Sequence, residues 1–261
     1  MMAGAFLARM RGRAATLGGG IAVVLAGLAA WQALSWIVDA RILPGPIPVV
    51  LALIDQLDEG LLGHAAVSAW RVALAIIISI SIAAPLGLIL GTNARLYSLS
   101  APLIYLSYPV PKIVVLPVIL LFLGLGDASK VTMIALILFF QILILVRDEV
   151  RTVRAELILS VRSLGANRLQ LLRYVYVPAS LPGLFTALRI STGVSIAVLF
   201  FVESFGTRQG LGYYILVESW GRLAYEEMYA GVITMAVLGL GIYYVVDGLE
   251  RRLTRWNRDN R

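Results

Sequence analysis

Long apolar runs alternate with short polar stretches along this chain of 261 residues. Six of the runs approach or exceed the roughly 20 residues that a helix needs to cross a bilayer. They occupy residues 17–38, 71–91, 99–122, 131–146, 183–202 and 229–246. A secretory signal is the rival interpretation of the first run, but the run is too long for one and no small-x-small cleavage site follows it. The pattern predicts an all-α polytopic membrane protein with six transmembrane helices.

The third run differs from the others because prolines interrupt it. Pro102, Pro109, Pro111 and Pro117 all fall within residues 99–122. Proline lacks the backbone N–H that a helix interior needs, so we expect a kinked or broken helix there. Two connectors are also expected. Residues 39–70 begin with a turn and continue as a surface helix over 49–62, and residues 204–228 are polar and rich in glycine and aromatics.

Residues 156–182 form the longest polar interruption in the chain. Their first part predicts a short amphipathic helix, after which Gly165 suits the left-handed position that closes a helix. Asn167 can cap a second amphipathic helix by accepting a backbone N–H. Pro178 and Pro182 are expected to end that helix. Two short helices around a glycine corner predict that residues 156–182 form a protruding element, here called the knob, to which another protein could bind. The alternative is an ordinary interfacial loop.

Composition strengthens the membrane assignment and excludes several classes of site. Apolar residues make up 60% of the chain and charged residues 14%, and the mean hydropathy is +0.88. Soluble domains carry about 25% charged residues. With no cysteine, the chain has no disulfide or thiolate site. The single histidine, His64, excludes bis-histidine haem and His-Glu-x-x-His zinc sites and is expected at the surface.

Basic residues indicate how the six spans are oriented. Fifteen arginines fall in the N-terminal segment, the loop after the second span, the 156–182 element with its approach, and the tail. The opposite side carries five basic residues, so both termini and the 156–182 element are expected on the cytoplasmic side. This asymmetry explains the net charge of +7 without a nucleic-acid partner. The predicted organisation is a cytoplasmic segment 1–16, a six-helix domain 17–246, and a basic tail 247–261 that contacts anionic lipid.

The 156–182 element resembles the cytoplasmic signature of binding-protein-dependent ABC importer permeases. That signature reads Glu-Ala-Ala, three residues, Gly, nine residues, Ile-x-Leu-Pro. Here Gly165 is followed at that spacing by Val175-Tyr-Val-Pro178, and Pro182 lies close behind. The acidic position of the motif is Leu159, which departs from the family and puts in doubt any ion pair made there. The resemblance implies that the ATPase-coupling residues are Leu159, Ser160, Val161, Arg162, Ser163, Leu164, Gly165, Ala166, Asn167 and Arg168.

Further segments are similar to the nitrate/sulfonate/taurine branch of these permeases. They are Tyr108-Pro-Val-Pro-Lys112, Leu116-Pro117, Phe122-Leu-Gly-Leu-Gly126 with Ser129-Lys130, Arg162-Ser-Leu-Gly-Ala-Asn167, Pro178-Ala-Ser-Leu-Pro182 and Gly210-Leu-Gly-Tyr213. The resemblance implies a type I (MetI-like) importer fold in the bacterial inner membrane. It also implies a small anionic substrate such as a sulfonate, taurine or nitrate, with a vitamin precursor or other small organic solute as the alternative.

The same resemblance implies the partners. They are ATPase subunits that bind ATP and Mg²⁺, a second permease copy that forms a homodimer, and a periplasmic or lipid-anchored binding protein. The sequence itself contains no Gly-x-x-x-x-Gly-Lys-[Ser/Thr] motif, and its only lysines are Lys112 and Lys130. The chain is therefore expected to bind no cofactor, to be no enzyme, and to depend on a partner for ATP hydrolysis.

Three charged residues within or at the ends of spans are candidates for the translocation path. Lys112 could hold a carbonyl freed by Pro109 or Pro111, or it could face the path. Arg189 could snorkel or pair, or it could attract anions at the inner mouth. Glu203 suits an interfacial or interchain partner better than a proton relay. Gly206, Gly210, Gly212 and Tyr213 belong to a loop that is either a tight turn or a gate that contacts the binding protein.

Two other function classes fit the residues less well. A stand-alone secondary transporter favours inverted repeats and several acidic groups at mid-membrane, and the chain shows neither. A membrane enzyme or scaffold subunit is the third class. No paired carboxylates, Ser–His pair or metal-ligand cluster supports catalysis.

Overall fold

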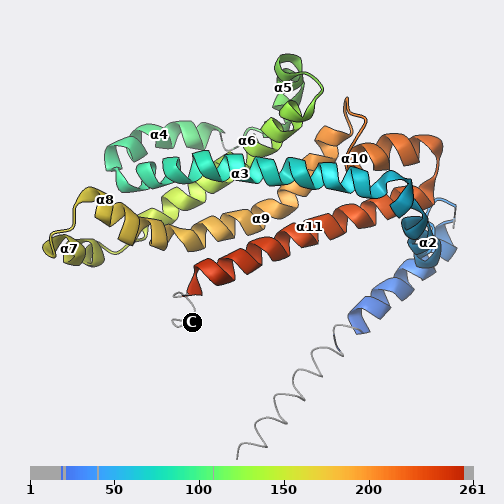
Figure 1. Cartoon of the computed structure of the whole chain (residues 1–261), viewed down its shortest axis with the longest axis horizontal. Coiled ribbons are helices and arrows are strands. Elements are labelled where there is room, and N and C mark those ends of the chain that lie inside the picture. The colour runs from blue at the N-terminus through green and yellow to red at the C-terminus, as the bar shows by residue number, and fades with distance from the viewer. Residues whose placement is uncertain (1–18, 20–21, 40, 108, 256–261) are drawn as a thin grey trace, which may run out of the picture.

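A computed structural model describes residues 19, 22–39, 41–107 and 109–255 of the chain (Figure 1). The predicted N-terminal segment 1–16 and the last residues of the predicted tail lie outside this part. The described chain is helical throughout. After a helix over Ala22–Val38, its elements are α2 (Pro46–Gln56), η1 (Leu57–Leu61), α3 (Leu62–Thr92), α4 (Ala94–Ser107), η2 (Lys112–Val115), α5 (Leu116–Leu123), α6 (Asp127–Arg151), α7 (Ala155–Ser163), α8 (Arg168–Leu171), η3 (Leu172–Tyr176), α9 (Val177–Glu203), α10 (Leu211–Tyr213), η4 (Tyr214–Ser219), η5 (Trp220–Arg222) and α11 (Tyr225–Leu253).

Four long helices, α3, α6, α9 and α11, lie side by side and form the body of the molecule (Figure 1). Contacts between α3 and α6 advance together along both helices, from Arg71 with Asp127 to Gly87 with Leu143, so the two helices are parallel. Helix α9 returns between them and α11. One end of the body carries α7 and α8, and the other carries α2 and α10 (Figure 1).

Small residues allow α3 and α6 to approach closely. A Cβ added at Gly87 would lie 3.0 Å from the carbonyl oxygen of Leu143, and one at Gly91 would lie 2.7 Å from Cβ of Val150. Ser79 Oγ donates across the same interface to the carbonyl oxygen of Ala135 at 3.0 Å. Lipid gives apolar side chains little reason to associate, so close packing and interhelical hydrogen bonds of this kind hold membrane helices together.

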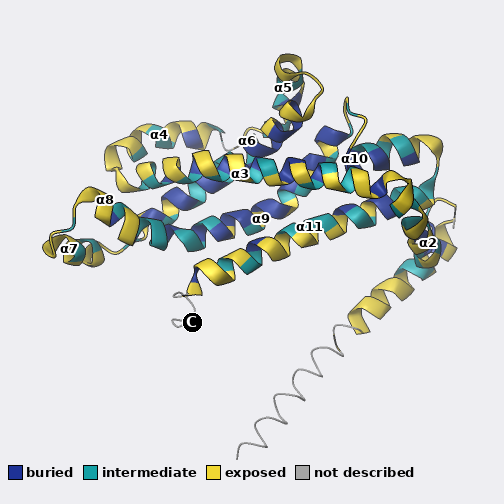
Figure 2. Cartoon of the chain, viewed as in Figure 1, coloured by how far each residue is buried: buried dark blue, intermediate teal, exposed yellow. Residues whose placement is uncertain are grey.

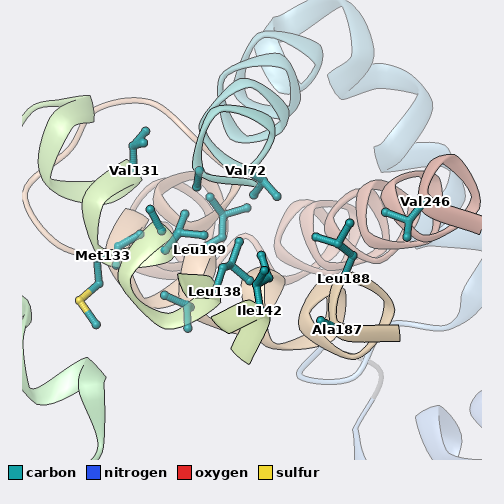
Figure 3. Packing of buried hydrophobic residues seen from close by; sticks show 14 of the residues in the cluster. Val72, Val131, Met133, Leu138, Ile142, Ala187, Leu188, Leu199 and Val246 are labelled. Atoms are coloured by element: carbon teal, nitrogen blue, oxygen red, sulfur yellow. The ribbon is translucent and has the colours of Figure 1, made fainter. Parts of the chain in front are cut away.

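The buried core lies where these four helices meet. Figure 3 shows Val72 of α3, Leu138 and Ile142 of α6, and Leu188 and Leu199 of α9 directed toward one another. On the outer faces of the helix bundle, apolar side chains are exposed, which is the reverse of the pattern in a soluble protein. Large apolar side chains are exposed along α3 and α11 and at a few positions of α9 (Figure 2), as expected for surfaces that face lipid or another subunit, whereas α6 is the central helix and exposes none over Asp127–Arg151.

The third predicted span is broken, as its prolines indicate. α4 ends at Ser107, and the η2–α5 pair continues at an angle of 81°. α5 therefore projects away from the four-helix body (Figure 1) and packs against α6. Leu121 and Phe122 at its tip are about four-fifths exposed, at 81% and 80%.

Several predicted boundaries are wrong. The surface helix expected over 49–62 is α2, which passes through the π-helical turn η1 directly into α3, so the second span begins at Leu62 and not at residue 71. The bend there comes at Gly60, whose φ is +120°. The polar connector 204–228 contains α10, η4 and η5, and its last four residues already belong to α11, which begins at Tyr225 and not at residue 229. α11 continues to Leu253, past the expected end at residue 246, because a basic last turn stabilises a helix C-terminus.

Four of the described helices are long and apolar enough to cross a membrane, and the bent α4–α5 pair makes a fifth if it counts as one span. The helix Ala22–Val38 is apolar but shorter than the length of a full span. The all-helical membrane architecture is therefore confirmed, while the count of six remains a prediction.

Candidate functional site

The predicted knob is present at one end of the body. α7 closes at Gly165, whose φ is +86°, a conformation that favours glycine because other residues clash there. Asn167 caps α8 in a reciprocal box: its Oδ1 accepts from the backbone N–H of Gln170 at 2.9 Å, and its own N–H donates to Gln170 Oε1 at 2.8 Å. The glycine corner and the cap expected from the sequence are both confirmed.

The expectation that Pro178 and Pro182 end the second helix is wrong. α8, η3 and α9 form one continuous helix from Arg168 to Glu203. The five residues before α9 form a π-helical turn, and Pro178 lies in the first turn of α9, where a missing N–H is tolerated. The knob is therefore joined to the membrane helix α9 without a flexible linker.

An open cleft of about 600 Å³ lies beside the knob. Its walls come from the α3–α4 corner and from α7, α8 and η3, and they bring Arg95, Arg162 and Arg168 around one space. None of the three arginines forms an ion pair with an acidic residue within the part of the chain that the structure describes. Beside them, Leu159, Leu164 and Leu169 are 61%, 85% and 71% exposed. This end thus presents cationic and apolar groups together.

Lys112 lies at the break between α4 and α5. Its Nζ donates to the carbonyl oxygen of Ser107 at 2.7 Å and lies 5.1 Å from the centroid of the Phe140 ring. A helix would pair the Ser107 carbonyl with the N–H of residue 111, but that residue is Pro111. The predicted role of Lys112 in holding a proline-freed carbonyl is therefore confirmed.

Arg189 is half-buried in α9 and forms an ion pair with Glu250 of α11. The structural pairing expected as one alternative is what the structure shows. The pair links the α7–α8 end of α9 to the last turns of α11. A role in the path remains a prediction.

At the opposite end, Glu203 is fully buried at the end of α9. Its carboxylate accepts from Arg71 Nη1 at 2.7 Å, from Ser68 Oγ at 2.8 and 2.9 Å, and from the backbone N–H of Gly212 at 3.0 Å. Arg71 also donates to Asp127 Oδ1 at 2.6 and 2.9 Å, and Asp127 is 60% exposed. A buried charge held by this many donors is stabilised by pairing, and its partners become essential. Glu203 therefore joins α9 directly to α3 and α10, and to α6 through Arg71.

Gly210 and Gly212, two of the candidate loop residues, pack directly against Glu203 of the Arg71–Glu203 ion pair. Gly210 has φ +116°, and a Cβ there would lie 2.4 Å from the carboxyl carbon of Glu203. A Cβ at Gly212 would lie 2.6 Å from the carbonyl oxygen of Phe200. Both positions therefore require glycine. Tyr213, half-buried, stacks on His64 with ring centroids 6.0 Å apart.

His64 is not the surface residue expected. Its side chain is 15% exposed, Nδ1 accepts from the backbone N–H of Gly210 at 3.1 Å, and Nε2 lies 3.4 Å from Glu218. The neighbouring Tyr214 hydroxyl donates to Gln56 Oε1 at 3.0 Å. Burial raises the pKa of Tyr214 to about 12, so the hydroxyl stays protonated and keeps this bond at neutral pH.

The sequence profile of the family described as "Binding-protein-dependent transport system inner membrane component" matches residues 83–258. The chain belongs to this family. It is thus a multi-pass inner-membrane permease of an ABC importer, a transport subunit and not an enzyme, and the family implies ATPase and binding-protein partners.

Relatives of known name support the permease assignment. The chain is 32% identical over 202 residues to the taurine transport system permease protein TauC of Escherichia coli K12, covering 77% of this chain and 73% of that protein. It is 30% identical over 232 residues to the putative aliphatic sulfonates transport permease protein SsuC of Bacillus subtilis 168, covering 88% and 84%. These relatives are consistent with the nitrate/sulfonate/taurine branch.

The fold matches solved structures of the methionine ABC transporter MetNI in inward-facing conformations. For the native CY5 crystal form the TM-score is 0.63 at 20% identity, covering 76% of this chain and 98% of that chain. The MetI-like fold of the permease is therefore confirmed.

Sequence reasoning missed the partners of the buried charges in this permease. Arg71 and Lys130 were considered only as two of the five basic residues on the side opposite the 156–182 element, yet they are 2% and 0% exposed. Asp127 and Ser68 were not singled out. A signal was available: Arg71 stands at the start of an apolar run, where a charge needs a partner, and Glu203 stands at the end of another. Nothing in the sequence indicated that the two ends meet.

Proposed function

We propose that this permease moves a small anion of the sulfonate or taurine type across the inner membrane, delivered by a binding protein and driven by a separate ATPase. The single observation that supports the coupling part most strongly is the continuous helix from the knob into α9. A rigid connection of this kind transmits displacement of the knob to the membrane helices. The substrate class follows the relatives, which are named for taurine and aliphatic sulfonates.

The proposed docking surface for the ATPase is formed by residues 159–168 of the knob. Exposed leucines beside arginines that have no acidic partner in the described part of the chain are typical of an interface with an apolar centre and charged surroundings. Because Arg95, Arg162 and Arg168 surround one cleft, we expect the ATPase to supply a carboxylate there.

The remaining arrangement follows from the same proposal. The α7–α8 end faces the cytoplasm with both termini, and the basic tail contacts anionic lipid. The loop Gly206–Tyr213 and α2 face the binding protein. A second copy of the permease completes the path as a homodimer, and the projecting α4–α5 arm, with its exposed apolar side chains, is the surface we expect it to cover.

The test is recovery of the ATPase complex after co-expression. The variant Gly165→Asp with Ala166→Glu places two carboxylates in the knob and strains the left-handed corner. We expect the variant to insert in the membrane but to lose the ATPase on purification. The matched control is Gly60→Asp, which also has positive φ and open space around it but lies at the opposite end.

Loss of the complex in both variants would indicate general misfolding, whereas an unchanged complex in the knob variant would overturn the docking assignment. Uptake of radiolabelled taurine and ethanesulfonate, compared with a neutral pyrimidine, then tests the substrate class. Preferential uptake of the pyrimidine would contradict it.

A further inference from the structure

A small cavity lies against the break between α4 and α5, beside the apolar part of α6. Its volume is about 190 Å³, and it is lined by Ser107, Lys112, Ile137, Phe140, Gln141 and Ile144. Gln141 lies 14 residues after Asp127 and 6 before Arg147 on α6, or about 21 Å and about 9 Å along the helix axis. The cavity therefore lies within the apolar part of α6, nearer to its Arg147 end.

The polar groups that line this cavity cost free energy because they lie within the membrane-spanning part of the chain. An ammonium within a membrane-spanning segment is unfavourable unless it is paired or functional, and such residues generally mark substrate or ion pathways. Lys112 is held there by the Ser107 carbonyl and the Phe140 ring, both at the cavity wall. Capping one carbonyl accounts for where the ammonium lies, but it does not account for the cavity or for the amide that also lines it.

Gln141 adds a second polar group to the same wall. Its Oε1 accepts from Ser191 Oγ of α9 at 2.5 Å. With the oxygen turned to Ser191, the amide nitrogen is the atom that Gln141 offers to a ligand, and it is a donor. An ammonium and an amide N–H on one wall favour an oxyanion, and Ile137 and Ile144 suit a short hydrocarbon chain.

The break in the backbone adds to this picture. Secondary transporters, a different class of membrane protein, also place substrate sites where helices are discontinuous, because unwound backbone supplies polar groups there. The cavity is smaller than the roughly 300–1,000 Å³ of pockets that hold drug-sized ligands, so its occupant is small.

We propose that the cavity at Lys112 and Gln141 is a membrane-embedded contact site for a small oxyanion with a short organic chain, such as an alkanesulfonate. The proposal rests on the proposed transport function and extends it by naming where the anion is held within the permease. Lys112 supplies the charge, Gln141 a directional donor, and the isoleucines the apolar contact.

The absence of native cysteine allows a direct test. Ile144→Cys places one thiol in the cavity wall of the full chain, expressed with its ATPase and held in nanodiscs. Two thiol reagents of similar size are compared: sulfonatoethyl methanethiosulfonate, an anion, and its trimethylammonioethyl counterpart, a cation. In each case the thiolate attacks the reagent sulfur, forms a mixed disulfide and releases methanesulfinate.

We expect the anionic reagent to react at least about tenfold faster than the cationic one, because a nearby full charge acts through a weakly screening interior. Lys112→Met should remove this preference, and Lys112→Arg should retain it. The matched control is Arg252→Met, which removes an exposed positive charge from the last turn of α11 and should leave the preference unchanged. Millimolar ethanesulfonate should slow the reaction of the thiol in the Lys112 background.

Equal rates for the two reagents, a preference unaffected by Lys112→Met, or no reaction with and without ATP would each overturn the proposal. If Lys112→Met fails to insert in the membrane, the test is the effect of ethanesulfonate on the Ile144→Cys variant that retains Lys112. An unchanged labelling rate with ethanesulfonate would then overturn the proposal. The labelling reports on the cavity thiol whether or not the ATPase stays bound to the permease. Its failure is therefore distinguishable from loss of the ATPase complex, which tests the proposed function.

Discussion

The two ends of this permease treat their charges in opposite ways. At the α2–α10 end, Arg71 and Glu203 are almost completely buried and each is held by several partners from the same chain. At the α7–α8 end, Arg95, Arg162 and Arg168 surround an open cleft and have no acidic partner among the described residues. A buried charge needs a partner within the protein, whereas an exposed guanidinium is solvated by water and remains available to bind another molecule.

Under the proposed function, this difference assigns stability to the first end and coupling to the second. The buried ion pair closes one end within the chain itself and anchors the loop that carries Gly210 and Gly212. The basic knob is complete in its backbone, with the Gly165 corner and the Asn167 cap in place, but incomplete in its charges. Substitutions at the first end should therefore affect folding, and substitutions at the second should affect partner binding.

The largest effect is expected from Arg71→Met. It leaves the Glu203 carboxylate buried without its cation and should destabilise the permease by about 3–5 kcal/mol. The shift in the midpoint of thermal unfolding of the purified permease in nanodiscs measures this. The control at the same end is Arg222→Gln, which breaks the partly exposed pair with Glu227 and should cost at most about 1 kcal/mol.

The double variant Arg71→Met with Glu203→Gln sharpens the same prediction. Removing both charges should recover part of the loss, because the unpaired carboxylate is the main penalty. Equal stability of Arg71→Met and the native chain would show that the Arg71–Glu203 ion pair does not stabilise this end of the permease.

A smaller difference is expected between two glycines with positive φ. Both Gly210→Ala and Gly165→Ala introduce backbone strain, but only Gly210 has a neighbour in the way, the Glu203 carboxylate at 2.4 Å. Gly210→Ala should therefore be less stable than Gly165→Ala by about 1–3 kcal/mol. Thermal unfolding of the two variants side by side measures the difference, and equal losses would contradict the crowded geometry at Glu203.

Local features of the fold were predictable from the sequence. The glycine corner, the Asn167 cap, the broken third span and the carbonyl held by Lys112 each depend on a few neighbouring residues. The predictions of helix ends failed where a helix continues through a residue that usually ends one. Pro178 was expected to end a helix, but a π-helical turn lets the helix pass.

The buried charge cluster could not be predicted in the same way. Arg71, Asp127 and Glu203 come from three separate helices, and their meeting depends on how those helices pack. The cavity beside Lys112 is of the same kind, because Gln141 and Ser191 are polar residues in two different spans that only packing brings together.

The central claim is that the α7–α8 end is the surface completed by the ATPase. The most direct measurement is the rate of maleimide labelling of single cysteines with and without the ATPase. Ser163→Cys reports on the knob, and Ala128→Cys, exposed near the start of α6, reports on the opposite end. We predict that the ATPase slows labelling of Ser163→Cys and leaves Ala128→Cys unchanged. Protection of Ala128→Cys with free labelling of Ser163→Cys would contradict the claim.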